Sequence, residues 1–159
     1  MPIPSARLDL NFSHFSMKVI QPQSLDDFEK YYRLRWEVLR KPWGWERGSE
    51  LADDEDKCIH AMIVNEKNET IAVCRLQMNS ADEAQIRFMG VRDDQQGKGI
   101  GKVIMNYLEN IAKEKGAKTV ILQGRENAVA FYKKQGYVIV EESYLMWGKI
   151  QHYLMRKIL

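Results

Sequence analysis

The chain has 159 residues, of which 45% are hydrophobic and 29% charged, and this composition is typical of one soluble globular domain. Its formal net charge of +2 is too small to indicate nucleic-acid binding. No apolar run approaches the roughly 20 residues that span a bilayer, and the N-terminus lacks the pattern of a signal peptide. We therefore expect a cytoplasmic protein that binds neither membranes nor nucleic acid.

The first third of the chain is expected to contain an irregular arm over residues 1–15, a strand at MKVIQ and one helix. The helix begins after Ser24, because Asp27 three residues later forms a near capping box, and Pro42 ends it. Its apolar stripe is expected at Leu25, Phe28, Tyr32, Trp36 and Leu39. The segment after Pro42 has no periodicity and is rich in acids and turn formers, which predicts a loop.

The rest of the chain alternates between strand and helix patterns. Apolar runs bounded by polar turns predict strands at residues 58–64, 70–78, 84–91, 118–124, 137–143 and 150–158. A strongly periodic helix is predicted over 99–115, with Gly116 at its C-terminal end, and a short helix over 128–135. This order predicts a mixed α/β sheet with helices on its faces, in a single domain over residues 16–159.

The two cysteines, Cys58 and Cys74, lie in apolar segments that resemble strands. In a cytoplasmic protein such cysteines are interpreted as reduced core thiols. No CxxC or HExxH spacing occurs in the chain, so no metal site is expected.

The stretch QQGKGIGK, residues 95–102, places three glycines between a predicted strand and the long helix. A Walker loop requires four residues between its first glycine and the Gly-Lys pair, whereas three residues separate Gly97 from Gly101. The dinucleotide fingerprint G-x-G-x-x-G fails on spacing as well. What remains is Q-x-x-G-x-G, at Gln96, Gly99 and Gly101, which either binds an anion at the helix N-terminus or only allows a sharp turn.

A second segment, NAVAFYKKQGY, follows about 25 residues later and contains Asn127 and Tyr132. Together the two segments resemble the GNAT superfamily of N-acetyltransferases, whose members carry R/Q-x-x-G-x-G/A before their long helix and N-x-x-A-x-x-F-Y-x-x-x-G-F/Y after the next strand. The resemblance is specific over residues 84–140. The segments LRWEVLRKPWG and IQHYLM are similar to a bacterial subgroup of unassigned function, in which a proline usually stands where this chain has Gln151.

The resemblance implies that acetyl-CoA is the cosubstrate and that no metal is needed. Backbone amides of the loop would hold its pyrophosphate, at Gln96, Gly97, Lys98, Gly99, Ile100 and Gly101. The preceding strand would pair with the pantetheine amides at Met89, Gly90 and Val91, where one N–H would polarise the acetyl carbonyl. Gly90 suggests a bulge in that strand. The implied fold has a mostly antiparallel central sheet, a splayed parallel pair at the coenzyme site and helices on both faces.

The resemblance also implies that Tyr132 is the catalytic residue, a general acid that protonates the departing thiolate. Asn127 would hydrogen-bond the pantetheine arm, with a plain helix N-cap as the alternative. The general base stays open between a water relay and seven side chains, which are Glu37, Asp53, Asp54, Glu55, Asp56, His60 and His152.

We therefore predict an N-acetyltransferase in which a primary amine of a small molecule or peptide attacks acetyl-CoA directly in a ternary complex. The alternative is a non-catalytic acyl-CoA sensor or partner module of the same fold. A nucleotide-binding regulatory domain is disfavoured by the failed spacings. A homodimer is a further expectation.

Overall fold

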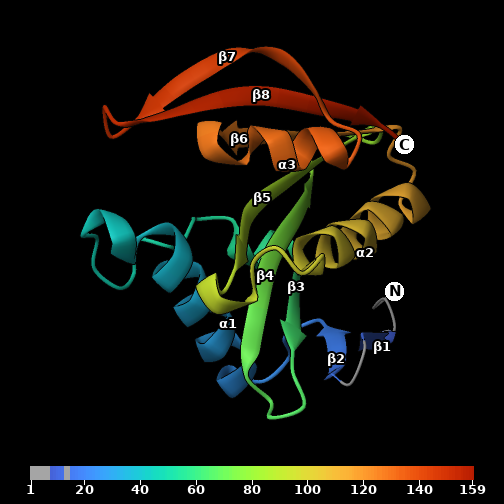
Figure 1. The fold of residues 1–159 in the computed structure, drawn as a ribbon. Helices are drawn as coiled ribbons and strands as arrows, with labels where there is room; N and C mark the ends of the chain where they lie inside the picture. The colour runs from blue at the N-terminus through green and yellow to red at the C-terminus, as the bar shows by residue number, and fades with distance from the viewer. Residues whose placement is uncertain (1–7, 13–14) are drawn as a thin grey trace. The chain divides into compact units, whose positions relative to one another are not determined.

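The computed structural model describes residues 8–12 and 15–159 (Figure 1). Its strands are β1 Leu8–Phe12, β2 Phe15–Ile20, β3 Ile59–Val64, β4 Thr70–Met78, β5 Glu83–Val91, β6 Thr119–Arg125, β7 Val138–Met146 and β8 Ile150–Ile158. Its α-helices are α1 Leu25–Leu39, α2 Ile100–Glu114 and α3 Val129–Lys134. Four 3-10 turns join them, η1 Lys41–Trp43, η2 Glu55–Lys57, η3 Asp93–Gln95 and η4 Glu126–Ala128. In this part of the chain no helix is long and apolar enough to cross a membrane.

The strands form one sheet in the order β1-β2-β3-β4-β5-β6-β8-β7. Neighbours pair in antiparallel fashion at β1–β2, β2–β3, β6–β8 and β7–β8, whereas β5 and β6 are parallel. The parallel register joins Glu83 to Thr119 and Gln85 to Ile121, and so covers only the first three positions of two much longer strands. The expected mixed sheet with a splayed parallel pair is therefore confirmed.

The chain divides into two compact units. The first comprises Met1–Arg75 and Phe88–Leu108, and the second comprises Leu76–Arg87 and Glu109–Leu159. The expected single domain over residues 16–159 stays a prediction.

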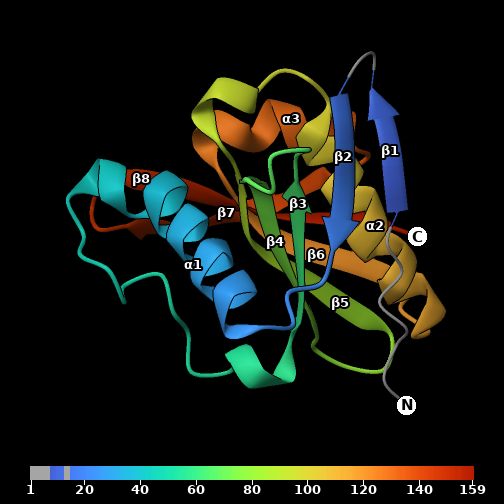
Figure 2. The same ribbon diagram turned by 90° about the horizontal axis from the view of Figure 1, so that it is seen from below.

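In the first unit, α1 lies alongside β3 and β4 (Figure 2). The helix begins with the expected capping box, because the Ser24 hydroxyl accepts from the Asp27 N–H at 3.0 Å and the Asp27 carboxylate accepts from the Ser24 N–H. The core between helix and sheet contains five buried residues, which are Tyr31, Leu34, Met62, Val64 and Val73.

The buried face of α1 differs from the predicted apolar stripe. Leu25 is 91% exposed, and the other four stripe residues are half-buried. The helix instead buries Tyr31, Leu34 and Arg35, so the side facing the sheet is rotated by about one residue. The hydrophobic pattern could not assign Arg35 to the buried face, since a charged residue is rarely fully buried unless it is paired.

The expected irregular arm over residues 1–15 is wrong where the structure describes it. Leu8–Phe12 forms β1, which pairs with β2 from Leu8 opposite Val19 to Phe12 opposite Phe15. Residues 1–7 and 13–14 lie outside the described residues.

In the second unit, β7 and β8 form a long hairpin next to α3 (Figure 1). A buried carboxylate, Glu109 of α2, accepts from Lys157 of β8 at 2.9 Å and from the Tyr137 hydroxyl at 3.3 Å. Gly124 of β6 permits close packing, because a Cβ there would lie 3.0 Å from the Met155 sulfur and 3.2 Å from the Tyr132 ring. These contacts fix the position of α3 against its own part of the sheet.

Neither of the two cysteines forms a disulfide within the part of the chain that the structure describes, and only Cys74 belongs to the core. Cys74 is buried in β4, and Cys58 is half-buried just before β3. Its thiol donates to the Asp54 carbonyl at 3.2 Å.

Candidate functional site

The glycine loop joins β5 to α2 in the first unit. Gly97 and Gly99 have φ values of 76° and 81°, which lie in the left-handed region that side chains other than glycine rarely adopt. A Cβ at either position would meet no atom within 4 Å, so the requirement for glycine is conformational and the space around the loop is open. The side chain of Gln96 ties the loop to the strand by donating to the Val91 carbonyl at 3.1 Å.

The N-terminus of α2 lies directly behind this loop. Because Val103 donates to the Gly99 carbonyl as the first helical hydrogen bond, the N–H groups of Ile100, Gly101 and Lys102 precede the helical ladder. No acidic residue stands in the first turn of this 15-residue helix, and Lys98 beside it is exposed. The arrangement suits an anion, since both the helix dipole and the lysine favour negative charge there.

The strand that precedes the loop is irregular at Phe88. Gly90 has no left-handed φ, whereas Phe88, two residues earlier, has a φ of 53°. Gly90 instead allows α1 to approach, because a Cβ there would lie 3.3 Å from the Val38 side chain. The strand is thus strained at Phe88 and makes close contact with α1 at Gly90, whereas the expected bulge at Gly90 stays a prediction.

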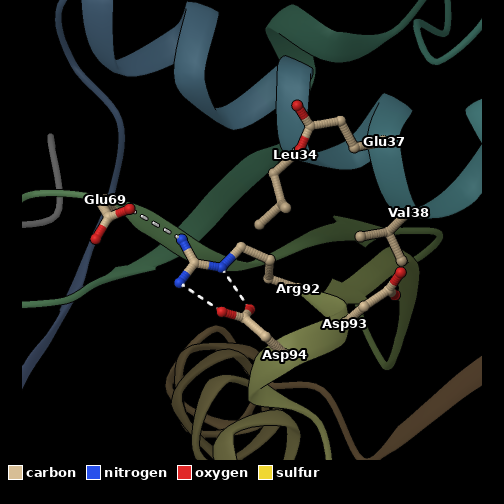
Figure 3. Close-up of a pocket in the computed structure, with 7 residues that line it drawn as sticks. All are labelled: Leu34, Glu37, Val38, Glu69, Arg92, Asp93 and Asp94. Atoms are coloured by element: carbon tan, nitrogen blue, oxygen red, sulfur yellow. Dashed lines mark hydrogen bonds and ion pairs between the residues drawn. The ribbon is translucent and has the colours of Figure 1, made fainter.

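A pocket of about 420 Å³ lies between α1 and the segment that follows β5 (Figure 3). It is lined by Leu34, Glu37, Val38, Glu69, Arg92, Asp93 and Asp94. Arg92 donates to Asp94 at 2.6 Å and to Glu69 at 3.3 Å, and these pairs raise the pKa of the guanidinium, with Asp94 as the main cause. Four carboxylates against one paired arginine make the pocket suitable for a cation and unsuitable for a pyrophosphate.

Of the candidate bases, Glu37 lines this pocket, and the acids of the loop before β3 do not. Asp54 accepts from Arg75 at 3.0 Å, and Glu55 accepts from Arg75 and Arg35. Burial alone would raise the pKa of Glu55, but the two guanidiniums lower it below its ordinary value. Asp53 and Asp56 are exposed.

The two candidate histidines are held by neighbouring groups. His60 donates from Nε2 to the Glu55 carbonyl at 2.7 Å, and its Nδ1 lies 2.9 Å from the Tyr31 hydroxyl. Burial lowers the pKa of His60, which favours the neutral ring. The Tyr31 hydroxyl has one proton and two acceptors in reach, His60 Nδ1 and the Cys74 carbonyl at 3.2 Å. In the second unit His152 is buried, donates from Nδ1 to the Ile150 carbonyl at 3.0 Å and stacks on Tyr144.

The remaining predicted site residues, Asn127 and Tyr132, belong to the second unit. Asn127 is exposed inside η4, and Ala128 is the N-cap of α3, so the N-cap alternative for Asn127 is wrong. Tyr132 is only 9% exposed and packs edge-on against Phe131 and Tyr137, with ring centroids 5.3 and 6.1 Å away.

A residue that the sequence analysis missed lies at the end of β6. Burial lowers the pKa of Arg125, and the neighbouring hydroxyl groups of Tyr132 and Tyr144 oppose that shift. Arg125 is half-buried and lies near the predicted acid, Tyr132. No motif pointed to it, since it lies between the strand and the NAVAFY segment.

Among residues 8–12 and 15–159 no group of three or more His, Cys, Asp or Glu side chains is arranged to hold a metal ion. The expectation that no metal is needed stays a prediction.

Comparison with known proteins agrees with the sequence motifs. The model of the acetyltransferase (GNAT) family matches residues 28–137, which is more than two thirds of the chain. This range contains the glycine loop, the strained strand and the segment with Asn127 and Tyr132.

Two curated relatives are similar over most of the chain. The uncharacterised N-acetyltransferase YjcF of Bacillus subtilis is 26% identical over 141 residues, which cover 89% of this chain and 99% of the relative. The [ribosomal protein bS18]-alanine N-acetyltransferase of Haemophilus influenzae is 29% identical over 125 residues, which cover 76% and 82% of the two chains.

The fold is also similar to that of an aminoglycoside 6'-N-acetyltransferase whose crystal structure contains coenzyme A. The TM-score is 0.68 at 17% identity, with 85% of this chain and 92% of the other covered. At this identity the likeness supports the fold alone.

Proposed function

The chain belongs to the acetyltransferase (GNAT) family, and from this premise we propose that it is an acetyl-CoA-dependent N-acetyltransferase that acts on a primary amine of a small molecule or peptide. The observation that carries the proposal is the open loop at Gly97 and Gly99, set before an α2 N-terminus that no acidic residue caps. A diphosphate fits this arrangement because it needs exposed N–H groups and positive charge without bulky side chains.

In this proposal the loop from Gln96 to Gly101 binds the coenzyme through backbone N–H groups, and Lys98 adds a positive charge. The side-chain bond from Gln96 to the Val91 carbonyl holds the loop against the end of β5. The bound coenzyme supplies an activated acetyl thioester.

The residues around Met89, Gly90 and Val91 would then align the thioester. A backbone N–H of this segment donates to the acetyl oxygen, where negative charge develops as the amine attacks, and Val38 supports Gly90 from α1. Tyr132 donates its proton to the departing sulfur, since a phenol with an ordinary pKa near 10 is protonated at pH 7. Asn127 hydrogen-bonds the pantetheine arm.

The acceptor amine must lose a proton before it attacks, because an amine with a pKa of about 10.4 is cationic at pH 7. We assign this step to Glu37, directly or through water, since Glu37 lines the acid-rich pocket next to β5. The acids around it attract a cationic amine by their field. Acceptors of two matched proteins, a ribosomal-protein alanine and an aminoglycoside, both provide amines.

A thermal-shift series with acetyl-CoA, CoA, ATP and NAD tests the binding part of this proposal. A ligand at 100 times its Kd adds about 2.7 kcal/mol, which corresponds to a Tm increase of roughly 5 to 11 °C for a protein of this size. Acetyl-CoA and CoA should produce the shift, whereas a comparable shift with ATP would contradict the assignment. Release of free thiol in the presence of an amine then separates an enzyme from a sensor that only binds acyl-CoA.

The cytoplasmic location and the homodimer expected from the sequence are part of this proposal and stay predictions. Gel filtration with light scattering measures the second directly.

A further inference from the structure

Phe88 is held in a conformation that its sequence does not favour. Its φ of 53° lies in the left-handed region, and among the described residues it shares a positive φ with only two others that are not glycine, Asn68 and Trp147. Those two lie in turns, whereas Phe88 lies inside β5. Backbone strain of this kind persists only where the surrounding structure holds it.

Three guanidinium groups surround the Phe88 ring. The central carbon of Arg35 lies 4.2 Å from the ring centroid, that of Arg75 lies 5.0 Å away and that of Arg40 lies 5.8 Å away. These distances are within the range of cation–π attraction, which is stronger where water is excluded. Arg35 and Arg75 have no exposed surface, so the ring is held by desolvated cations.

The guanidiniums are themselves fixed by acids. Glu55 accepts from Arg35 and from Arg75, and Asp54 accepts from Arg75 at 3.0 Å. Arg35 also donates to the Glu50 carbonyl at 3.0 Å and to a buried tyrosine hydroxyl at 2.9 Å. Residues of α1, of β4 and of the loop before β3 are thereby joined around one aromatic ring in β5.

A purely structural role does not account for this cluster. Burying an ion pair costs desolvation energy, and well-packed apolar residues often replace such pairs without loss of stability. The ion pairs fix the orientation of the side chains, because a forked guanidinium fits only one orientation of its carboxylate. The residues directly after Phe88 are Met89, Gly90 and Val91, which the proposed function places against the thioester and the pantetheine arm.

We propose that Arg35 and Arg75 are positioning residues, which fix the Phe88 ring and thereby aim the backbone N–H groups from Met89 to Val91 at the acyl-CoA. The inference rests on the proposed function for the coenzyme. Neither arginine touches the reacting atoms in this account, and both act through the ring.

The test replaces the ring while keeping an apolar side chain, as Phe88→Leu. The Phe88→Tyr protein keeps the π face and serves as the conservative rescue. Val19→Ala is the control for lost stability, because Val19 is fully buried in β2 and is not among the residues of this cluster. Each protein is measured for Tm, for the amide spectra of residues 89–91, for the Kd of acetyl-CoA and for kcat.

Phe88→Leu should shift the amide signals of Met89, Gly90 and Val91 and lower kcat by about tenfold or more, a part of the 10²- to 10³-fold that a lost oxyanion donor costs. Phe88→Tyr should restore most of kcat, and Val19→Ala should lower Tm with kcat and the amide signals unchanged. If Phe88→Leu does not fold, Arg75→Lys tests the same positioning role, because lysine keeps the charge but not the fork that binds Asp54 and Glu55, and it should shift the same amide signals with a smaller loss of kcat.

The proposal is overturned if Phe88→Leu, or Arg75→Lys in its place, behaves like Val19→Ala, with unchanged amide signals and kcat. If the wild-type protein neither binds nor turns over acetyl-CoA, the proposed function is wrong and the positioning role toward the coenzyme is wrong with it. Shifted amide signals in that case still show that the ring holds β5, so the two failures are distinguishable.

Discussion

Changing Gly99 to alanine tests whether the glycine loop binds the coenzyme. A substitution at a glycine can cost free energy through backbone strain or through a steric clash. Gly99 has a φ of 81°, and a Cβ there would meet no atom within 4 Å. No clash is expected, so the whole penalty is conformational and amounts to about 1 to 2 kcal/mol for a left-handed alanine. If the loop keeps its conformation, the penalty lowers Tm by roughly 2 to 8 °C for a chain of this size.

If the free loop relaxes instead, the same penalty is incurred when acetyl-CoA binds. It then weakens the Kd by about 5- to 30-fold, since 1.4 kcal/mol corresponds to a factor of ten. Isothermal titration with acetyl-CoA and a thermal melt of the same sample measure both quantities. The free energy of unfolding that is lost and the binding free energy that is lost should together equal the conformational penalty.

Gly44→Ala is the matched control. Gly44 has a φ of 82°, has open space around it as well, and lies after η1, away from the loop. Its substitution should lower Tm to a similar degree and leave the Kd for acetyl-CoA unchanged. If Gly99→Ala lowers Tm and leaves the Kd unchanged, as Gly44→Ala does, or if both variants weaken binding equally, the loop is only a turn.

Three further outcomes follow from the site and its surroundings. Tyr132→Phe should lower kcat by about 10²-fold with little change in the Kd of acetyl-CoA, and an unchanged kcat under conditions where chemistry limits turnover would return Tyr132 to a packing role. Glu37→Gln should lower kcat/KM at neutral pH and recover as the pH approaches the pKa of the amine; a flat response would favour a water relay. Wild-type stability in urea should fall by at most about 1.4 kcal/mol per pH unit as the pH drops below about 6.5, because burial lowers the pKa of His60 and only the unfolded chain takes up that proton. His60→Gln should lose this slope, and an identical slope in both proteins would contradict the assignment.

The sequence predicted a glycine loop before the long helix because its signals are local. The glycine spacing and the helix start depend on neighbouring residues, and Gly97 and Gly99 adopt left-handed conformations in this loop. The role of the loop in binding the coenzyme stays a prediction. The strand and helix patterns of the long elements are local in the same way.

The buried cluster around Phe88 could not be predicted, because its members are distant in the chain. The sequence places Glu55 in a loop rich in acids. In the structure it pairs with Arg35 and Arg75, which lie 20 residues before it and 20 residues after it in the chain. A helix pattern assigns arginine to the exposed face, so the burial of Arg35 also displaced the predicted stripe of α1. The sequence also gives no sign of the left-handed φ at Phe88, because contacts with residues distant in the chain hold it.

The missed strand β1 had a visible signal of its own. Apolar residues alternate with polar ones at Leu8, Leu10 and Phe12, which is the pattern of a strand with one buried face. Five residues are too few to separate this pattern from an irregular arm, and pairing with β2 decided the outcome.

The measurement that tests the central claim most directly is acetyl transfer itself. Purified protein, acetyl-CoA and a panel of small-molecule and peptide amines are combined, and free thiol is followed together with the acetylated amine by mass spectrometry. At least one amine should yield thiol and acetyl-amine in equal amounts, and Tyr132→Phe should slow the formation of both. Stable binding of acetyl-CoA without turnover of any amine in the panel would contradict the proposed activity and would identify a coenzyme-binding module instead.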